Sequence, residues 1–187
     1  QALKAMNRYP EAIVDLTSLF VKDTTDTKIL IDLAECYKLM GSPRQAADYY
    51  RKAVSLRPNN KFFRLQYIRS LLNAENFKEA RDACHGWLEQ DTVSATGYKY
   101  LGQAYEGMQD IPNAFFSYNV AYRRDSLDAQ TVARIANIFN NNRQFTDAID
   151  VTECYRLSDT TSVDVNRQNA KAYCMLKDYK KAIERYE

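Results

Sequence analysis

The sequence predicts an all-α fold, a solenoid of antiparallel helix pairs, and two observations predict it. Glycine and proline are scarce, with five and four in 187 residues, which suits helices joined by short turns. One alanine recurs every 34 residues along the chain. A repeat of this length is typical of helical arrays in which each unit contacts only its neighbours. The six anchor alanines are Ala12, Ala46, Ala80, Ala114, Ala148 and Ala182.

Apolar side chains on both sides of each anchor alanine predict two helices per unit. They recur nine positions before it and four after it, and turn-forming residues such as Met40-Gly41-Ser42-Pro43 and Asn140-Asn141-Asn142 lie between the two stripes. The anchor should lie where the two helices approach most closely, because a larger side chain there would overpack the pair. The positions nine before hold Leu3, Tyr37, Leu71, Tyr105, Phe139 and Tyr173, and the positions four after hold Leu16, Tyr50, Cys84, Tyr118, Thr152 and Tyr186.

Two stretches of the chain resemble the tetratricopeptide repeat. One is Leu33-Ala34-x-x-Tyr37 with Ala46, Tyr50, Ala53 and Pro58, and the other is Tyr98-x-x-Leu101-Gly102-x-x-Tyr105 with Ala114, Tyr118 and Ala121. The resemblance implies a right-handed superhelical solenoid. It divides one continuous array into a partial repeat at 1–26, full repeats at 27–60, 61–94, 95–128 and 129–162, and a truncated repeat at 163–187. We expect the chain to be a fragment of a longer protein.

Three departures from the family pattern carry expectations. Trp87 stands where the family usually has alanine, and we expect Gly97 and Gly102 to make room for it. Asn166 and Asn169 replace apolar residues in the last unit, so its first helix should be the least stable.

Composition and motifs argue against a catalytic or metal-binding role and against nucleic acid or membranes as partners. The net charge is +2, from 26 basic and 24 acidic residues, which disfavours nucleic acid and membrane surfaces as partners. No apolar run is long enough to span a membrane. The four cysteines have no metal-ligand spacing, so we predict no metal and no cofactor, and their scatter favours a reducing compartment. His85 is the one histidine, and no catalytic residue is predicted.

The resemblance implies that the first helices of successive repeats line a concave groove for an extended peptide. The groove positions fall 18, 15, 14, 11, 8 and 7 residues before each anchor. In the early half they are largely apolar and include Ile31 and Leu39, whereas the later half is polar and more basic. The candidate groove residues are Phe62, Leu65, Arg69, Leu72, Lys99, Tyr100, Gln103, Arg134, Asn137, Asn140, Asn141, Arg167 and Lys171.

This uneven content leads to a hypothesis about the partner. An extended segment would place an apolar part on the early repeats and an acidic part, or a C-terminal carboxylate, on the later ones, because arginine can grip a carboxylate with two parallel bonds. The carboxylate clamp that some family members use for chaperone tails is rejected, since Asp164 stands where the clamp needs a positive charge.

Two other readings remain open. The array is alternatively a structural spacer or an element that self-associates end to end, because open solenoid ends expose apolar helix faces. It is alternatively the docking arm of a larger protein whose catalytic domain lies outside residues 1–187.

Overall fold

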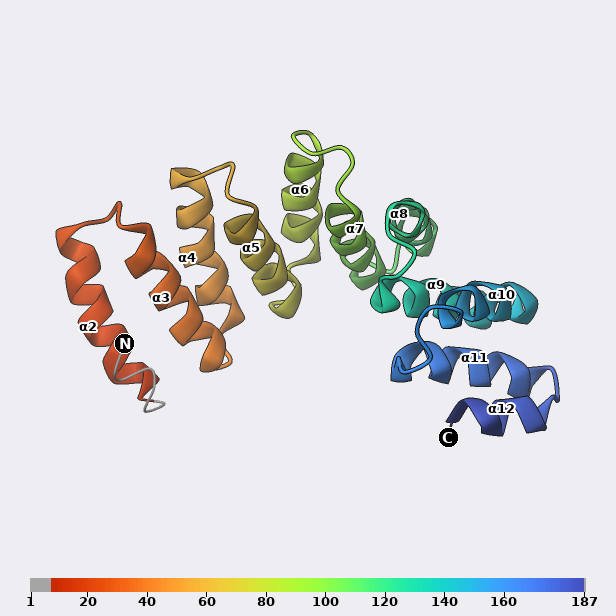
Figure 1. The fold of residues 1–187 in the computed structure, drawn as a ribbon. Helices are drawn as coiled ribbons and strands as arrows, with labels where there is room; N and C mark the ends of the chain where they lie inside the picture. Colours follow the sequence, from red (N-terminus) through yellow and green to blue (C-terminus); the bar gives the residue numbers. More distant parts are fainter. Residues whose placement is uncertain (1–7, 187) are drawn as a thin grey trace. The chain divides into compact units, whose positions relative to one another are not determined.

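The computed structural model describes residues 8–186, which form eleven helices and no strand (Figure 1). Leu3, one of the predicted apolar positions, lies outside the described residues. The prediction of an all-α fold of helix pairs is confirmed. The helices are α2 (Tyr9–Lys22), α3 (Thr27–Leu39), α4 (Pro43–Leu56), α5 (Lys61–Asn73), α6 (Phe77–Leu88), α7 (Ala95–Gly107), α8 (Ile111–Arg124), α9 (Ala129–Asn141), α10 (Phe145–Arg156), α11 (Val163–Met175) and α12 (Tyr179–Tyr186).

The helices group into two compact units, one up to Trp87 and one from Leu88 onward. In the first unit α3 packs on α4, and α4 on α5. In the second unit the pairs α7 with α8, α9 with α10 and α11 with α12 pack together, and each later pair also packs on the pair before it. Within each unit, therefore, consecutive helices are the main packing partners, as in a solenoid.

Short polar side chains start many of the helices. The side chain of Asp26 accepts hydrogen bonds from two backbone N–H groups at the start of α3, and Asn60, Ser94, Asp110 and Asp128 accept one or more in the same way. These caps satisfy donors that the first turn of a helix leaves without a partner. Helix α8 also has a proline in its first turn, where no backbone donor is lost.

Among residues 8–186, the five turns within helix pairs share one backbone conformation. In each, the residue five positions before the anchor alanine has a φ between 57 and 71°. The next N–H donates to the carbonyl oxygen of the residue nine before the anchor, at 2.9 Å. This left-handed closure is the one that usually recruits glycine after a helix, yet only one of the five is glycine. The five residues are Gly41, Glu75, Gln109, Arg143 and Lys177.

Replacing Arg143 by glycine is expected to raise the free energy of unfolding by about 0.5–1 kcal/mol. A left-handed conformation costs a non-glycine residue roughly 1–2 kcal/mol in the folded state, and glycine removes this cost. Part of the gain is lost because glycine has more conformational freedom in the unfolded chain. Urea denaturation measures the change. Gly41→Ala is the matched control and should destabilise the chain, whereas a destabilising Arg143→Gly would contradict the assignment.

The anchor alanines lie in the core, as predicted. Those of the four central pairs are fully buried, and Ala12 and Ala182 are 5% and 6% exposed. Ala148 packs in one cluster with Ala136 and Ala172, so three alanines bring α9, α10 and α11 together. Close helix approach at a small residue thus explains the period.

Gly97 and Gly102 have neighbours other than the expected Trp87. A Cβ built on Gly97 would lie 2.8 Å from Cδ2 of Leu88, and one on Gly102 would lie 2.6 Å from the ring of Tyr118. The side chains nearest to these glycines are therefore Leu88 and Tyr118. Tyr118 is fully buried, so the absence of a side chain at Gly102 is needed for its ring to pack.

Two other expectations need correction. The turn predicted at Asn140–Asn142 begins only at Asn142, because α9 continues to Asn141. Tyr186, predicted to be a core residue, is 66% exposed, whereas Tyr50 and Tyr118 in the same position of their repeats are buried. The structure describes no helix after α12 that could cover it.

Candidate functional site

The predicted groove positions of the second unit lie on α7, α9 and α11, and contacts between these helices connect them. We call this surface the first-helix face. The ammonium of Lys99 on α7 lies 3.0 Å from the carboxylate of Asp128, which caps α9. The amide of Asn140 on α9 donates to the backbone and the side chain of Gln168 on α11, at 3.0 and 3.1 Å.

Two of the predicted groove cations already have acidic partners. Besides the pair of Lys99 with Asp128, Nη1 of Arg134 lies 2.9 Å from Glu106. The hydroxyl of Tyr118 also donates to Glu106, at 2.7 Å. Burial, and then this hydrogen bond to a carboxylate, raise the pKa of Tyr118 above its ordinary value. Arg134 is therefore held by a polar network that reaches into the core, and the carboxylate of Glu106 balances much of its positive charge.

The cations of α11 are less neutralised. Nζ of Lys171 lies 3.2 Å from Oδ1 of Asn141, an uncharged partner. Arg167 pairs with Asp164 at 2.9 Å, but both side chains are more than half exposed, so the pair contributes little. The positive charge that remains available on the first-helix face is thus concentrated at α11.

The remaining candidates of this face are polar and partly buried. Tyr100 lies beside Lys99, whose ammonium is 5.6 Å from the ring centroid, and Asn137 is half-buried on α9. Oδ1 of Asn140 and Nε2 of Gln103 are buried and have no hydrogen-bond partner among the described residues. These two atoms are unused polar groups on the face.

The candidates of the first unit lie on α5 and are mainly apolar. Phe62 is 49% exposed, Leu65 and Leu72 are half-buried, and Arg69 is exposed. Phe62 contacts Phe63 edge to face, and Phe63 is buried in a core cluster with Leu30 of α3. The buried neighbour fixes the base of the exposed ring, so Phe62 presents an apolar contact on a rigid helix.

Asp128 should make the stability of the second unit depend on pH. Burial disfavours its carboxylate, but hydrogen bonds from Thr131 and the ammonium of Lys99 outweigh it, and the pKa of Asp128 is lowered. Its stabilising contribution is therefore present above the ordinary pKa and is lost as the pH falls through the folded one. We expect Asp128→Asn, which keeps the helix cap, to cost about 1 kcal/mol at neutral pH.

Urea denaturation at pH 7, 5 and 3 measures the loss in free energy of unfolding that Asp128→Asn causes. It should stay constant between pH 7 and 5 and shrink toward pH 3. Asp125→Asn, an exposed site in no ion pair among the described residues, is the control. A loss from Asp128→Asn that is equal at pH 7 and pH 3 would contradict the assignment.

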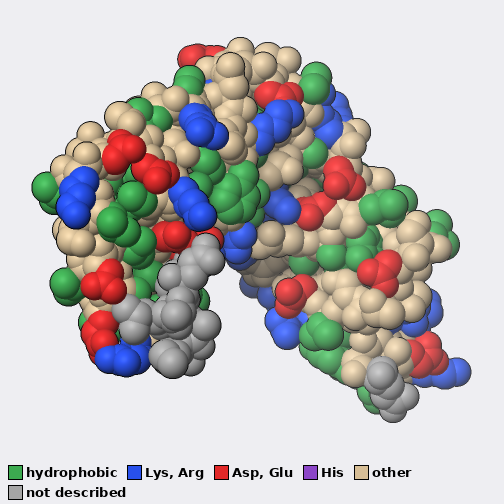
Figure 2. Space-filling view, turned by 60° about the vertical axis from the view of Figure 1, so that its left-hand side comes forward, with side chains coloured by type: hydrophobic (Ala, Val, Ile, Leu, Met, Phe, Trp, Pro, Cys, Tyr) green, Lys and Arg blue, Asp and Glu red, His purple; other side chains and the backbone are tan. Residues whose placement is uncertain are grey.

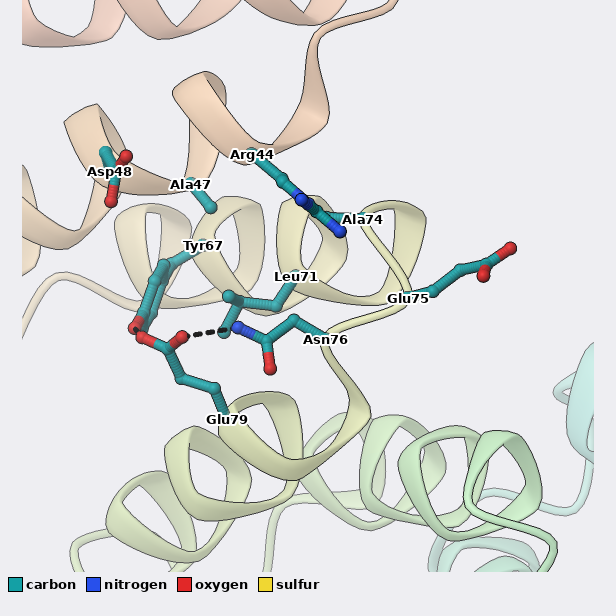
Figure 3. A pocket seen from close by; sticks show the side chains of 9 residues that line it. All are labelled: Arg44, Ala47, Asp48, Tyr67, Leu71, Ala74, Glu75, Asn76 and Glu79. Atoms are coloured by element: carbon teal, nitrogen blue, oxygen red, sulfur yellow. Dashed lines mark hydrogen bonds between the residues drawn. The ribbon is translucent and has the colours of Figure 1, made fainter.

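A polar recess of about 440 Å³ lies in the first unit between α4, α5 and α6 (Figure 3). Figure 3 shows the side chains of Tyr67 and Asn76 directed at Glu79, and their hydrogen bonds to it measure 2.5 and 2.6 Å. Asp48 on the opposite wall accepts from Arg51 at 3.0 Å. Two of the four charged residues that line the recess, Asp48 and Glu79, thus have partners within the protein.

This recess was not among the predicted sites, although the sequence contains a signal for it. Thirteen residues before the anchor, three repeats have a buried Leu or Ile, but two have Tyr67 and Asn169. Both polar residues form hydrogen bonds to the second helix of their own pair or of the preceding pair. Tyr67 donates to Glu79, and the fully buried Asn169 donates to Thr152 at 2.7 Å.

The remaining surface offers little chemistry. Burial raises the pKa of Cys84 to about 12, so beside His85 it stays a thiol rather than a nucleophilic thiolate. Among residues 8–186 no three His, Cys, Asp or Glu side chains group as metal ligands. None of the described helices is long and apolar enough to cross a membrane. Figure 2 shows basic and acidic side chains interspersed on one face, in line with the net charge of +2.

Comparison with known proteins identifies the repeat. Residues 27–60, which contain α3 and α4, match the family model described as tetratricopeptide repeat. This stretch of the chain is similar to a tetratricopeptide repeat. Proteins of this kind bind other proteins or peptides, so the family supports a role as an interaction scaffold in general. No curated protein gives a significant match to the sequence.

Solved structures share the fold over most of the chain. MamA aligns at 17% identity over 98% of this chain and 92% of its own, with a TM-score of 0.65. PilF of Pseudomonas aeruginosa aligns at 16% identity over 98% of this chain and 84% of its own, with a TM-score of 0.75. YrrB, described as a TPR protein with an unusual peptide-binding site, aligns at 16% identity over 91% of this chain and 88% of its own, with a TM-score of 0.62. Identities this low establish the fold alone.

Proposed function

We propose that the chain is a non-catalytic scaffold that binds an extended segment of a partner protein on its first helices. The observation that carries this proposal is the exposure of large apolar side chains in the predicted groove positions of the first unit. Leu39 is 56% exposed and Phe62 is 49% exposed. Half-buried apolar side chains on a rigid helix favour the binding of an apolar segment. Binding buries the rest of their apolar surface, and it costs little conformational entropy because the helix already holds these side chains in place.

The partner's acidic part is proposed for α11 rather than for the whole first-helix face. Lys99 and Arg134 are balanced by Asp128 and Glu106, whereas Lys171 contacts an amide and Arg167 an exposed carboxylate. A carboxylate of the partner gains most where the cation has no strong internal partner. The later half of the array would therefore recognise acidic residues through Arg167 and Lys171.

The test is selection from a phage-displayed library of random peptides, followed by titration of individual synthetic peptides. Peptides that bind the chain should lose at least about tenfold in affinity on Phe62→Asp. Burial of a phenylalanine side chain contributes about 1.5–3 kcal/mol, and 1.4 kcal/mol corresponds to tenfold.

The matched control is Phe116→Asp. Phe116 is 65% exposed on α8, the second helix of its pair, and its replacement should leave the affinity within about twofold. Circular dichroism and urea denaturation confirm that both variants remain folded. Peptides that depend on Phe116 and ignore Phe62 would refute binding on the first helices.

A further inference from the structure

The polar recess between α4, α5 and α6 has the size and lining of a site for a long side chain (Figure 3). Its volume of about 440 Å³ lies within the range of about 300–1,000 Å³ that ligand pockets occupy. Ala47 and Leu71 are nearly fully buried and contribute apolar surface, and the aromatic ring of Tyr67 also lines the recess. None of the lining residues stands at a predicted groove position, so this site is separate from the candidate groove.

Two carboxylates near Tyr67 keep most of their negative charge. Oε1 of Glu79 accepts a hydrogen bond from Tyr67 and Oε2 accepts one from Asn76, at 2.5 and 2.6 Å. Both donors are uncharged, so they position this carboxylate without neutralising it. Asp48 accepts from Arg51 at 3.0 Å, but both side chains are more than half exposed, so this pair is weak. Both carboxylates therefore remain available to a cation.

The fields of these two carboxylates overlap at Tyr67. Burial raises the pKa of the Tyr67 hydroxyl, the hydrogen bond to Glu79 and the charges of Glu79 and Asp48 raise it further, and the charge of Arg51 lowers it. In Figure 3 Arg44, the basic residue of the lining, extends away from Glu79. The space beside Tyr67 is therefore negative, and a positively charged group would balance it.

The repeat positions show that this combination belongs to one pair alone. Tyr67 stands thirteen residues before its anchor, Asp48 stands two after the preceding anchor, and Glu79 stands one before its own. No other repeat places carboxylates at both positions around an aromatic residue. Departures from a packing pattern are expected at functional sites. The corresponding trios are Val14, Leu33 and Gln45; Asp82, Leu101 and Asn113; Phe116, Ile135 and Asp147; and Asp150, Asn169 and Lys181.

The side chain of arginine matches this set of groups. Its guanidinium stacks on aromatic rings and donates to carboxylates in a fixed fork, and its aliphatic stem packs on apolar surface. Tyr67 offers the ring, Glu79 and Asp48 offer the carboxylates, and Ala47 and Leu71 offer the apolar surface. An acidic side chain would be repelled, and a purely apolar one would leave the carboxylates without a partner.

We infer that the recess between α4, α5 and α6 is a docking site for an arginine side chain of a partner protein. The inference rests on the proposed function in that the occupant belongs to a bound protein. It goes further because it assigns a second contact outside the groove positions and names its ligand. The guanidinium would lie on the ring of Tyr67 and donate to Glu79, and Asp48 would add a second negative charge.

The probe is a phage-displayed library of peptides with one fixed arginine between random residues. Peptides are selected on the wild-type chain, depleted on the Asp48→Lys variant and then titrated individually as synthetic peptides. Replacing the fixed arginine by citrulline, which keeps the shape and removes the charge, should weaken binding at least about fivefold, as for the loss of one ion pair.

Variants of the protein test the same contact from the other side. Asp48→Lys should weaken these peptides at least about tenfold, because it removes one attraction and adds a repulsion. Asp82→Lys is the matched control, since Asp82 has the same repeat position and its side chain is 64% exposed against 62% for Asp48. It should leave the affinity within about twofold. Tyr67→Leu restores the residue type of Leu33 and Leu101 and should weaken binding about fivefold, with the fold checked by circular dichroism.

A measurement that does not depend on affinity reports where the peptide binds. Ala47 and Ala74 line the recess, so their methyl resonances in a spectrum of the ¹³C-methyl-alanine-labelled chain should shift when peptide is added. The methyl resonance of Ala148, which is buried in the second unit, should stay in place.

Several results would overturn the inference. They are selection of no Asp48-dependent peptide, equal binding of the citrulline peptide, equal losses from Asp48→Lys and Asp82→Lys, or methyl resonances of Ala47 and Ala74 that do not move. Peptides that depend on Phe62 but not on Asp48 would sustain the proposed function and remove this site. Peptides that depend on Asp48 but not on Phe62 would sustain this site and remove binding on the first helices.

Discussion

Replacing Tyr118 by alanine is expected to lower the free energy of unfolding by about 3–5 kcal/mol, as for other buried aromatic side chains. Tyr118 is fully buried and packs with Ala114, Ile135 and Ile138, so its removal leaves a cavity between α8 and α9. It also removes the hydroxyl that donates to Glu106. Urea denaturation followed by circular dichroism measures the loss.

Two control variants separate the contribution of the buried ring of Tyr118 from that of its hydrogen bond and from that of an exposed ring. Tyr118→Phe keeps the ring and loses only the hydrogen bond to Glu106, so it should cost about 1–2 kcal/mol. Phe116→Ala removes an aromatic ring that is 65% exposed in the same helix and should cost less than about 1 kcal/mol. A loss from Tyr118→Ala no larger than that from Phe116→Ala would show that the ring does not hold the two helices together.

Replacing Ala148 by leucine is expected to cost about 1–3 kcal/mol through overpacking. Ala148 is fully buried against Ala136 and Ala172, so three added carbon atoms must separate α10 from α9 and α11. Helix propensity does not oppose the change, since alanine and leucine are both strong helix formers. The free energy of unfolding measures the result.

The control for Ala148→Leu is Asp150→Leu, an exposed site two residues further along α10. It adds a leucine to the same helix without filling the interface, so its effect should stay within about 0.5 kcal/mol. Equal effects at the two sites would mean that the period of alanines has a cause other than helix approach.

The sequence was sufficient for the helix pairs because their determinants are local and periodic. Caps such as Asp128 act within one helix, and the small residue at Ala148 lies at a position that recurs where neighbouring helices meet. The charge balance of the candidate groove was not predictable in the same way. Whether Arg134 reaches Glu106 depends on the spacing of two first helices and on side-chain rotamers, which a repeat pattern does not specify.

Two residues of the last pair lie in surroundings that their residue type alone does not predict. Asn169 forms a buried hydrogen bond to Thr152, which is itself polar at a position where the other full repeats have Tyr or Cys, while Oδ1 of Asn169 is buried with no hydrogen-bond partner among the described residues. The hydrogen bond pairs these two polar residues across α10 and α11, and neither residue alone would have predicted it. Tyr186 shows the opposite case, since its type and repeat position predict burial, yet it is 66% exposed.

The shared left-handed turn has a consequence for which residues can close a helix pair. Gly41, Glu75, Gln109, Arg143 and Lys177 close their pairs with one backbone geometry although their side chains differ in size and charge. All five residues are exposed, so the closure places no side chain in the core. The chemistry of this position can therefore change without altering how the two helices of a pair meet, so charge can be added or removed at these turns while the surfaces formed by the helices stay intact.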